Sequence, residues 1–258
     1  MNTGDAYMLT YQRQLEIMEI LKEKQVATVE YLSGKLYASG ATIRRDLSAM
    51  EKRGLLKRIH GGATVFESTA DDAPLLLRTK KEPDKKRLIA ELAVHLAQKH
   101  DIIFMDSSST VTALAALFDR YNGKTVVTNG LMTANVLNDK TTNNIYLTGG
   151  KIVGNSSLIG ESGLKMASGI NAGICFFSCC GFGAKGTTEA REETAVYKKT
   201  IAKNAKIKVL LCDSTKINTA YFWSAIPAGD IDYIVTDKKP PEDYLALPAE
   251  FIYPKVNG

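Results

Sequence analysis

Short hydroxyl and guanidinium side chains between residues 39 and 48 have the chemistry needed to contact nucleic acid. Ser39 can cap a helix, because its hydroxyl can accept a hydrogen bond from a backbone N–H that the first turn leaves unpaired. Apolar residues follow at spacings of four and three, which places them on one helical face: Ile43, Leu47 and Met50. The side chains outside this face are types that reach phosphates and base edges: Thr42, Arg44, Arg45 and Ser48. The spacing therefore predicts a helix with one buried face and one face available to DNA.

A hairpin is predicted directly after this helix. Gly54 lies where the helix should end. Residues 55–59 and 63–66 then have the composition of two short strands around a turn at Gly61-Gly62. A helix followed by such a hairpin is typical of a wing that supports DNA contact through its own basic side chains, here Lys57, Arg58 and His60.

The charge distribution favours phosphate binding over an ordinary solvated helix and hairpin. Residues 35–62 hold seven Lys/Arg and two Asp/Glu, a local charge of +5 that equals the net charge of the whole chain. A basic surface on a small helical unit is the expected footprint of nucleic-acid binding.

The run Thr42-Ile43-Arg44-Arg45-Asp46-Leu47, with Arg58-Ile59-His60-Gly61-Gly62-Ala63 after it, resembles the N-terminal signature of the DeoR family of bacterial transcriptional regulators. The resemblance implies a winged helix-turn-helix whose recognition helix enters the major groove. A helix over 11–24 and a second one capped by Thr28 would complete this unit. One departure from the family pattern is Gly40-Ala41, since glycine inside a helix costs about 1 kcal/mol relative to alanine.

Composition describes a folded chain without membrane spans. The protein has 258 residues, of which 45% are hydrophobic, so global disorder is excluded. Neither an apolar run of membrane length nor a secretory leader is present in the sequence, and we expect a cytoplasmic protein. Four cysteines, three of them in or beside one apolar run, are interpreted as buried reduced thiols, with a metal site or redox switch as the alternative: Cys175, Cys179, Cys180 and Cys212.

The second half of the chain alternates apolar strands with helices. A charged, proline-containing linker is predicted over 67–84, separating a DNA-binding domain over 1–66 from an α/β domain over 85–258. Six apolar runs with helices between several of them indicate a mostly parallel sheet covered on both faces: 102–105, 125–128, 145–148, 174–178, 208–212 and 231–236. The expected helices lie over 86–98, 110–118, 131–137 and 190–205. The fold class is therefore α/β, with a small N-terminal winged helix-turn-helix domain.

Polar residues follow these strands, at the sheet edge where such folds bind ligands. The run Asp106-Ser107-Ser108-Ser109-Thr110 enters a helix and can cradle an anion, although Ser109 or Thr110 could simply cap that helix. The other strand ends supply an amide, carboxylates, a hydroxyl and ammonium groups: Asn129, then Gly149-Gly150-Lys151, then Asp213-Ser214-Thr215-Lys216. This set fits a phosphorylated polyol better than a flat apolar ligand.

These segments also resemble the DeoR-family sensor domain, together with Gly160, Gly181, Gly183, Gly186 and the run Ile234-Val235-Thr236-Asp237. The resemblance implies a fold similar to ribose-5-phosphate isomerase and an effector that is a sugar phosphate. Two departures are Ser108, where the family usually has glycine, and Cys175-Phe176, where an acidic residue commonly begins the strand.

The same residues allow two other interpretations, dinucleotide binding and catalysis. The run Gly181–Gly186 fits the dinucleotide-binding pattern G-x-G-x-x-G, but no helix opens at its last glycine and Asp213 follows too late. We interpret it as a wall of the sugar-phosphate pocket, with Glu189 and Lys198 as contributors. Asp106, Glu189, Asp213 and Lys216 could instead catalyse an aldose–ketose isomerisation, yet binding is favoured because the pocket is attached to a DNA reader.

The sequence thus predicts a transcriptional regulator and not an enzyme. We expect a repressor of carbohydrate metabolism genes that binds a double-stranded DNA operator as a homo-oligomer, responds to a phosphorylated sugar and uses no cofactor or metal. An RNA-binding adaptor is disfavoured, because no aromatic stacking motif is present in the sequence.

Overall fold

The structure is a computed structural model that describes residues 3–52, 55–65, 75–153 and 156–254. The chain divides into two compact units, residues 1–74 and 75–258. The expected linker over 67–84 includes, in its described part, a short helix and the start of the next one: α4 (Leu75–Lys80) and α5 (Pro83–Ala93). The predicted helix end at Gly54 and the strand residue Phe66 lie outside the described residues.

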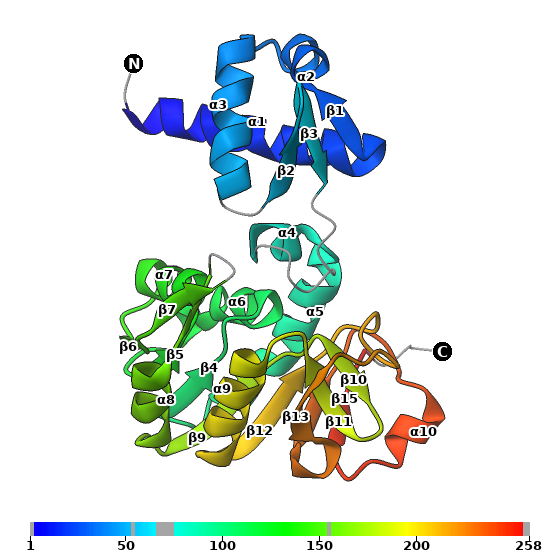
Figure 1. The fold of residues 1–258 in the computed structure, drawn as a ribbon. Coiled ribbons are helices and arrows are strands. Elements are labelled where there is room, and N and C mark those ends of the chain that lie inside the picture. The colour runs from blue at the N-terminus through cyan, green and yellow to red at the C-terminus, as the bar shows by residue number, and fades with distance from the viewer. Residues whose placement is uncertain (1–2, 53–54, 66–74, 154–155, 255–258) are drawn as a thin grey trace. The chain divides into compact units, whose positions relative to one another are not determined.

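The N-terminal unit is a winged helix-turn-helix (Figure 1). Its elements are α1 (Thr3–Lys24), β1 (Val26–Thr28), α2 (Val29–Lys35), α3 (Gly40–Lys52), β2 (Leu56–Ile59) and β3 (Gly62–Val65). Thr28 caps α2 as predicted, its hydroxyl accepting a hydrogen bond from the backbone N–H of Tyr31 at 3.1 Å. The core of the unit comes from all three helices and the wing, through side chains that are fully buried: Ile17, Leu21, Leu32, Ile43, Leu47, Met50 and Leu56.

The wing contains one strand and one turn that differ from the prediction. β1 was not predicted, and it pairs antiparallel with β3 to make the sheet order β1-β3-β2. Ile59 pairs with Gly62, so the turn residues are His60 and Gly61, not Gly61 and Gly62. Gly61 has a φ of 74°, a left-handed conformation that glycine adopts without strain. Gly62 therefore belongs to the central strand of this small sheet.

The C-terminal unit is built on a seven-stranded sheet of order β15-β14-β12-β9-β4-β5-β6, in which every pair is parallel. Six strands correspond to the predicted apolar runs: β4 (Ile102–Met105), β5 (Thr125–Thr128), β6 (Asn144–Leu147), β9 (Ala172–Phe177), β12 (Ala205–Leu211) and β14 (Tyr233–Val235). The seventh, β15 (Glu250–Ile252), was not predicted. Two smaller sheets add β7 (Lys151–Val153) with β8 (Ser157–Ile159), and β10 (Gly181–Gly183), β11 (Gly186–Glu189) and β13 (Trp223–Pro227).

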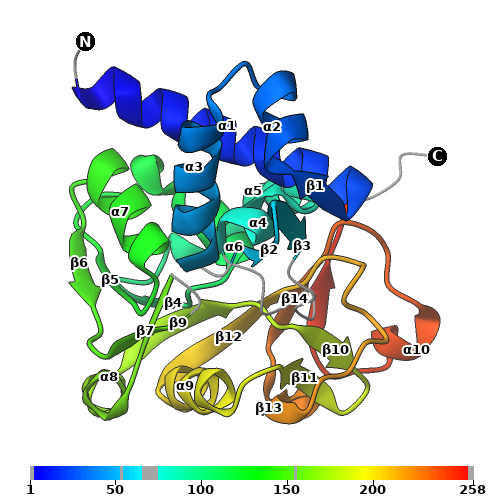
Figure 2. The ribbon, with the colours of Figure 1, turned by 45° about the horizontal axis from the view of Figure 1, so that its top comes forward.

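Helices cover both faces of the large sheet. One core lies between the sheet and α5, α6 (Ser109–Ala115) and α7 (Leu131–Lys140). The other lies against α8 (Glu161–Ser168), α9 (Glu192–Lys203) and α10 (Glu242–Leu245), and Figure 2 shows α8 and α9 beside the strands. Short 3-10 segments over Val94–Ala97, Phe118–Arg120 and Ala228–Asp230 complete the unit. Because helices cover both faces, the inner strands are nearly continuous apolar runs, whereas the edge strand β6 is largely exposed.

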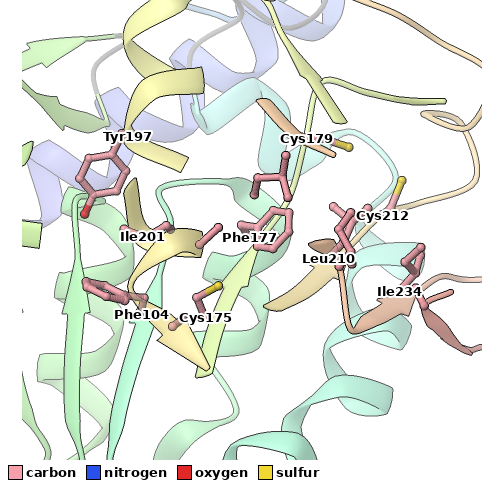
Figure 3. Packing of buried hydrophobic residues seen from close by; sticks show 14 of the residues in the cluster. Phe104, Cys175, Phe177, Cys179, Tyr197, Ile201, Leu210, Cys212 and Ile234 are labelled. Atoms are coloured by element: carbon pink, nitrogen blue, oxygen red, sulfur yellow. The ribbon is translucent and has the colours of Figure 1, made fainter. Parts of the chain in front are cut away.

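The four cysteines are free thiols, and three of them are buried in the core on the α9 side. Figure 3 shows Cys175 beside Phe104 and Phe177, and Cys179 and Cys212 at the ends of their strands. Burial raises the pKa of the Cys175 thiol, so it stays protonated. Within the described part of the chain, His, Cys, Asp and Glu side chains form no group of three that could hold a metal ion.

None of the helices in the described residues is long and apolar enough to cross a membrane.

The strand order changes direction between β4 and β9. From β4 the chain continues outward through β5 to β6, whereas β9, β12, β14 and β15 extend the sheet the other way. The loops after β4 and β9 therefore diverge at the carboxyl edge, where sheets of this kind bind their ligands.

Candidate DNA-reading surface and effector site

The recognition helix α3 begins as predicted. The Ser39 hydroxyl accepts a hydrogen bond from the backbone N–H of Thr42 at 3.2 Å, and the two hydroxyls lie 2.9 Å apart. Gly40 is the first helical residue, so the cost of glycine in a helix interior does not arise. Ile43, Leu47 and Met50 are fully buried, as their spacing indicated.

The opposite side of α3 exposes its two arginines. Arg44 and Arg45 are solvent-exposed, and Thr42 beside them is half-buried. On the wing, Lys57 and His60 are exposed as well. These five side chains are available to a DNA ligand without any change in the fold of the unit.

Ser48 and Arg58, both predicted to contact DNA, bind each other. The Arg58 guanidinium donates to the Ser48 hydroxyl at 2.9 Å, and the Arg58 backbone N–H donates to the Glu51 carboxylate at 2.8 Å. These bonds connect α3 to β2, so they fix the wing against the recognition helix.

Asp46 is a functional residue that sequence reasoning missed. It lies on the buried side of α3, where its carboxylate accepts from Arg13 of α1 at 2.5 Å and from Gln14 at 3.4 Å. This ion pair joins α3 to α1 and so supports the rotation that the buried apolar face gives to α3, and with it the direction of Arg44 and Arg45.

Replacing Asp46 by alanine should lower the free energy of unfolding of the N-terminal unit by about 2 kcal/mol, because Arg13 loses its charged partner. Operator affinity should fall as well, since α3 is no longer held. Urea unfolding monitored by circular dichroism checks this, with Glu16→Ala on the exposed side of α1 as a control of equal charge. Equal stability of the two variants would contradict the role given to Asp46.

At the carboxyl edge of the large sheet, Asp106 joins the two diverging loops. Its carboxylate accepts from the backbone N–H of Ser108 at 2.9 Å and from that of Ser178, after β9, at 3.0 Å. Its own backbone N–H donates to Phe176 at 3.1 Å. Asp106 is only 1% exposed, so this buried carboxylate holds the two loops together.

The hydroxyl side chains in the loop after β4 make different contacts. Ser108 caps α6, accepting from the backbone N–H of Val111 at 3.3 Å, so the expectation of a cap at Ser109 or Thr110 is wrong. Ser107 accepts from the hydroxyl of Ser157 at 2.6 Å. Ser109 and Thr110 are buried in the first turn. The Thr110 hydroxyl has no hydrogen-bond partner, and neither has the Asn129 side-chain oxygen after β5.

Lys198 of α9 is a buried cation with three partners. Its ammonium lies 2.6 Å from the Glu189 carboxylate, 2.7 Å from the Ser178 carbonyl oxygen and 3.4 Å from the Asp106 carboxylate. Burial by itself lowers the pKa of Lys198, but the charges of Glu189 and Asp106 outweigh it and the pKa is raised. Lys198 therefore stays charged and serves to hold the loops together.

Lys216 is the more accessible ammonium of the site. It donates to the Ser178 hydroxyl at 3.0 Å and lies 3.7 Å from the Asp213 carboxylate, with 19% of its side chain exposed. Burial lowers its pKa, but Cys179 and Asp213 more than offset this and the pKa is raised. Lys216 thus carries a positive charge at the carboxyl edge of the sheet.

The glycine run forms a hairpin. Gly181 and Gly183 lie in β10, which pairs antiparallel with β11, and the backbone N–H of Phe182 donates to the Lys216 carbonyl at 2.9 Å. A dinucleotide fingerprint needs a strand-to-helix turn, which this hairpin does not provide. The hairpin instead delivers Glu189, at the end of β11, to Lys198.

The structure brings together four of the predicted effector residues and separates three others from them. Asp106, Glu189, Asp213 and Lys216 form one network through Lys198, which was expected as a contributor to the pocket wall, and Ser178, which was not predicted. Ser178 ends the fourth apolar run, so the strand-end rule could have found it. Gly149, Gly150 and Lys151 lie against β8 and α8 instead.

Comparison with known proteins gives the family. Residues 13–69 match the DeoR-like helix-turn-helix domain and residues 81–238 match the DeoR C terminal sensor domain. The HTH-type transcriptional regulator GolR of Listeria innocua is 35% identical, over 90% of this chain and 92% of its own. The HTH-type transcriptional repressor GlcR of Bacillus subtilis is 30% identical, over 93% of each chain. The chain therefore belongs to the DeoR family and is a DNA-binding transcriptional regulator with a C-terminal sensor domain.

Proposed function

We propose that this regulator represses carbohydrate metabolism genes and releases or engages its operator when a phosphorylated sugar binds at the carboxyl edge of the seven-stranded sheet. The observation that carries the proposal is Lys216, whose side chain is partly exposed and whose ammonium lies beside the Ser178 hydroxyl, in the loop after β9, one of the two strands between which the strand order reverses. The repressor name of the relative GlcR supports the direction of regulation.

The polar groups at this edge of the sheet suit a phosphorylated sugar. The Lys216 ammonium supplies a charge-assisted hydrogen bond for a phosphate. The Thr110 hydroxyl and the Asn129 side-chain oxygen are buried without protein partners, and such atoms usually have a partner in the functional state. Sugar hydroxyls both donate and accept, so they suit this mixture of groups.

Binding without turnover is favoured over isomerisation. A general base has to be free to reach a substrate proton. The Asp106 and Glu189 carboxylates are instead engaged by Lys198 and by the Ser178 backbone N–H. The relatives are also named as regulators.

We further propose that the protein acts as a homo-oligomer. Helix-turn-helix proteins that read two half-sites present two recognition helices related by the symmetry of the assembly. The operator would then contain an inverted repeat.

Replacing Lys216 by methionine should weaken sugar-phosphate affinity by about 10–100-fold, the loss expected for a charge-assisted hydrogen bond. Isothermal titration calorimetry with a panel of pentose and hexose phosphates measures this. Lys185→Met, which removes an exposed ammonium from the β10–β11 turn, is the matched control. Undiminished affinity of the Lys216 variant would remove that residue from the site.

Replacing Arg44 by alanine should weaken operator binding by about 1–3 kcal/mol if this side chain reads a guanine. Fluorescence anisotropy at fixed salt, on a genomic fragment that the protein retains, measures the change. Arg87→Ala is the control, because Arg87 is an exposed arginine of the other unit. Unchanged binding would place Arg44 outside the interface.

A further inference from the structure

Helix α4 is the first element of the sensor unit after the segment that connects it, in sequence, to the DNA-binding unit. Two cationic side chains attach it to the rest of the sensor. Arg78 of α4 donates to the Ser156 hydroxyl at 3.4 Å. The ammonium of Lys86, in α5, donates to the backbone carbonyls of Arg78 and Lys81 at the end of α4.

The side chain of Lys86 lies in an unusual environment for a lysine. The residue is 5% exposed, and among the described residues its ammonium donates to these two neutral carbonyls and pairs with no carboxylate. Burial is the largest cause that lowers the pKa of Lys86, to about 8, and the positive charge of Lys216 is the next. The charge of Asp213 acts in the opposite direction. The charges of Lys216 and Asp213, two residues of the proposed effector site, therefore both act on the Lys86 ammonium.

The Arg78 attachment leads to the same site by a second route. Ser156 precedes Ser157, whose hydroxyl donates to Ser107 in the loop after β4. The Ser156 carbonyl also accepts from the backbone N–H of Leu131, after β5, at 2.8 Å. The Arg78 attachment of α4 is thus connected by hydrogen bonds to loops at the carboxyl edge of the sheet.

We propose that Lys86 and Arg78 are the positioning residues through which sugar-phosphate binding changes α4 and, through it, DNA binding. The inference rests on the proposed function. A phosphate bound at Lys216 attracts the Lys86 ammonium, which then leaves the carbonyls that end α4. Helix α4 is then released from the rest of the sensor unit. The occupied and empty states therefore differ at the element that follows the connecting segment in sequence. The coupling arises because the ligand favours the state in which α4 is released.

The test compares Lys86→Met, Lys86→Arg and Lys85→Met in the full-length protein. Lys85 is the matched control, because it is the adjacent lysine and pairs with Glu82 at 2.9 Å near the surface. The probes are the tightest-binding member of a panel of pentose and hexose phosphates and the genomic fragment that the protein retains most tightly. Three quantities are measured: sugar-phosphate affinity, fragment affinity with and without the sugar phosphate, and hydrogen exchange of the α4 amides.

In the wild-type protein the sugar phosphate should change fragment affinity by about 5–150-fold and should speed exchange in α4. Lys86→Met should exchange quickly in α4 without ligand, and its fragment affinity should no longer respond, although it still binds the sugar phosphate. Lys86→Arg and Lys85→Met should respond like the wild type.

A Lys86→Met protein with the wild-type response would overturn the inference while leaving the proposed function in place. If Lys86→Met does not fold, Arg78→Ala removes the second attachment and leaves the buried ammonium intact, and a full response of that variant would overturn the inference equally. A wild-type protein that binds no sugar phosphate would overturn the proposed function and this inference together.

Discussion

Replacing Lys198 by methionine should lower the free energy of unfolding of the sensor unit by about 3–5 kcal/mol, the cost of removing one partner from a buried ion pair. The Glu189 and Asp106 carboxylates are 2% and 1% exposed and would lose the cation that compensates them. Urea unfolding of the full-length protein, followed through the single tryptophan, Trp223 of β13, reports on this unit.

Lys199→Met is the matched control, because Lys199 is the next residue of α9 and its side chain is exposed. The double variant Lys198→Met, Glu189→Gln should recover part of the loss, since it leaves one buried carboxylate instead of two. A Lys198 variant as stable as the Lys199 variant would show that the network contributes little to the fold.

Replacing Gly62 by alanine should destabilise the N-terminal unit by about 3 kcal/mol and abolish operator binding, because a rigid backbone stands where the new methyl group must go. A Cβ on Gly62 would lie 2.3 Å from the Ala27 carbonyl oxygen and 2.9 Å from Thr28 Cα. The β1–β3 pairing would have to separate, and a unit this small has little stability to lose. Thermal unfolding followed by circular dichroism and a DNA retention assay measure both effects.

Gly34→Ala is the informative comparison. Gly34 lies in α2, and nothing lies within 4 Å of the Cβ that alanine would add. Alanine there should be neutral or stabilise the unit by up to about 1 kcal/mol, because it favours the helix. The two substitutions are chemically identical, so a similar loss from both would contradict the contact assigned to Gly62.

The periodicity of apolar residues predicted those elements in which one face is exposed to solvent and the other is buried in the core. The spacing of Ile43, Leu47 and Met50 was sufficient to orient the recognition helix, because burial of one face fixes its rotation. Asp46 was not identified as buried, because its partner Arg13 is 33 residues earlier in the chain. No local pattern indicates that a carboxylate has a distant arginine.

Six of the seven parallel strands were predictable as apolar runs, and the inner ones are apolar because both of their faces are buried. The short antiparallel strands of the sensor unit were not, since glycine and threonine dominate β10 and β11 and their stability comes from a distant strand. Thr188 of β11 pairs with Ser224 of β13, across an intervening helix and strand. The glycine run Gly181–Gly186 therefore has a composition that fits several structures, and the pairing of β10 with β11 makes it a hairpin.

The strand-end rule predicted part of the network at the carboxyl edge for a topological reason. Parallel strands bring their carboxyl ends to one edge, so Asp106, Asp213 and Lys216 were expected near one another. Lys86 and Ser157 reach the same edge from the start of a helix and from the β7–β8 hairpin. Their positions depend on tertiary packing that the strand order does not determine.

The most direct test of the central claim uses the purified protein and fragments of its own genome at fixed salt, sequenced after recovery with and without a panel of phosphorylated sugars. The account predicts a few sharply enriched fragments that share an inverted repeat and are lost or gained with one sugar phosphate. Uniform recovery that falls with salt and ignores every sugar phosphate would reduce the N-terminal unit to non-specific electrostatic binding and contradict the account.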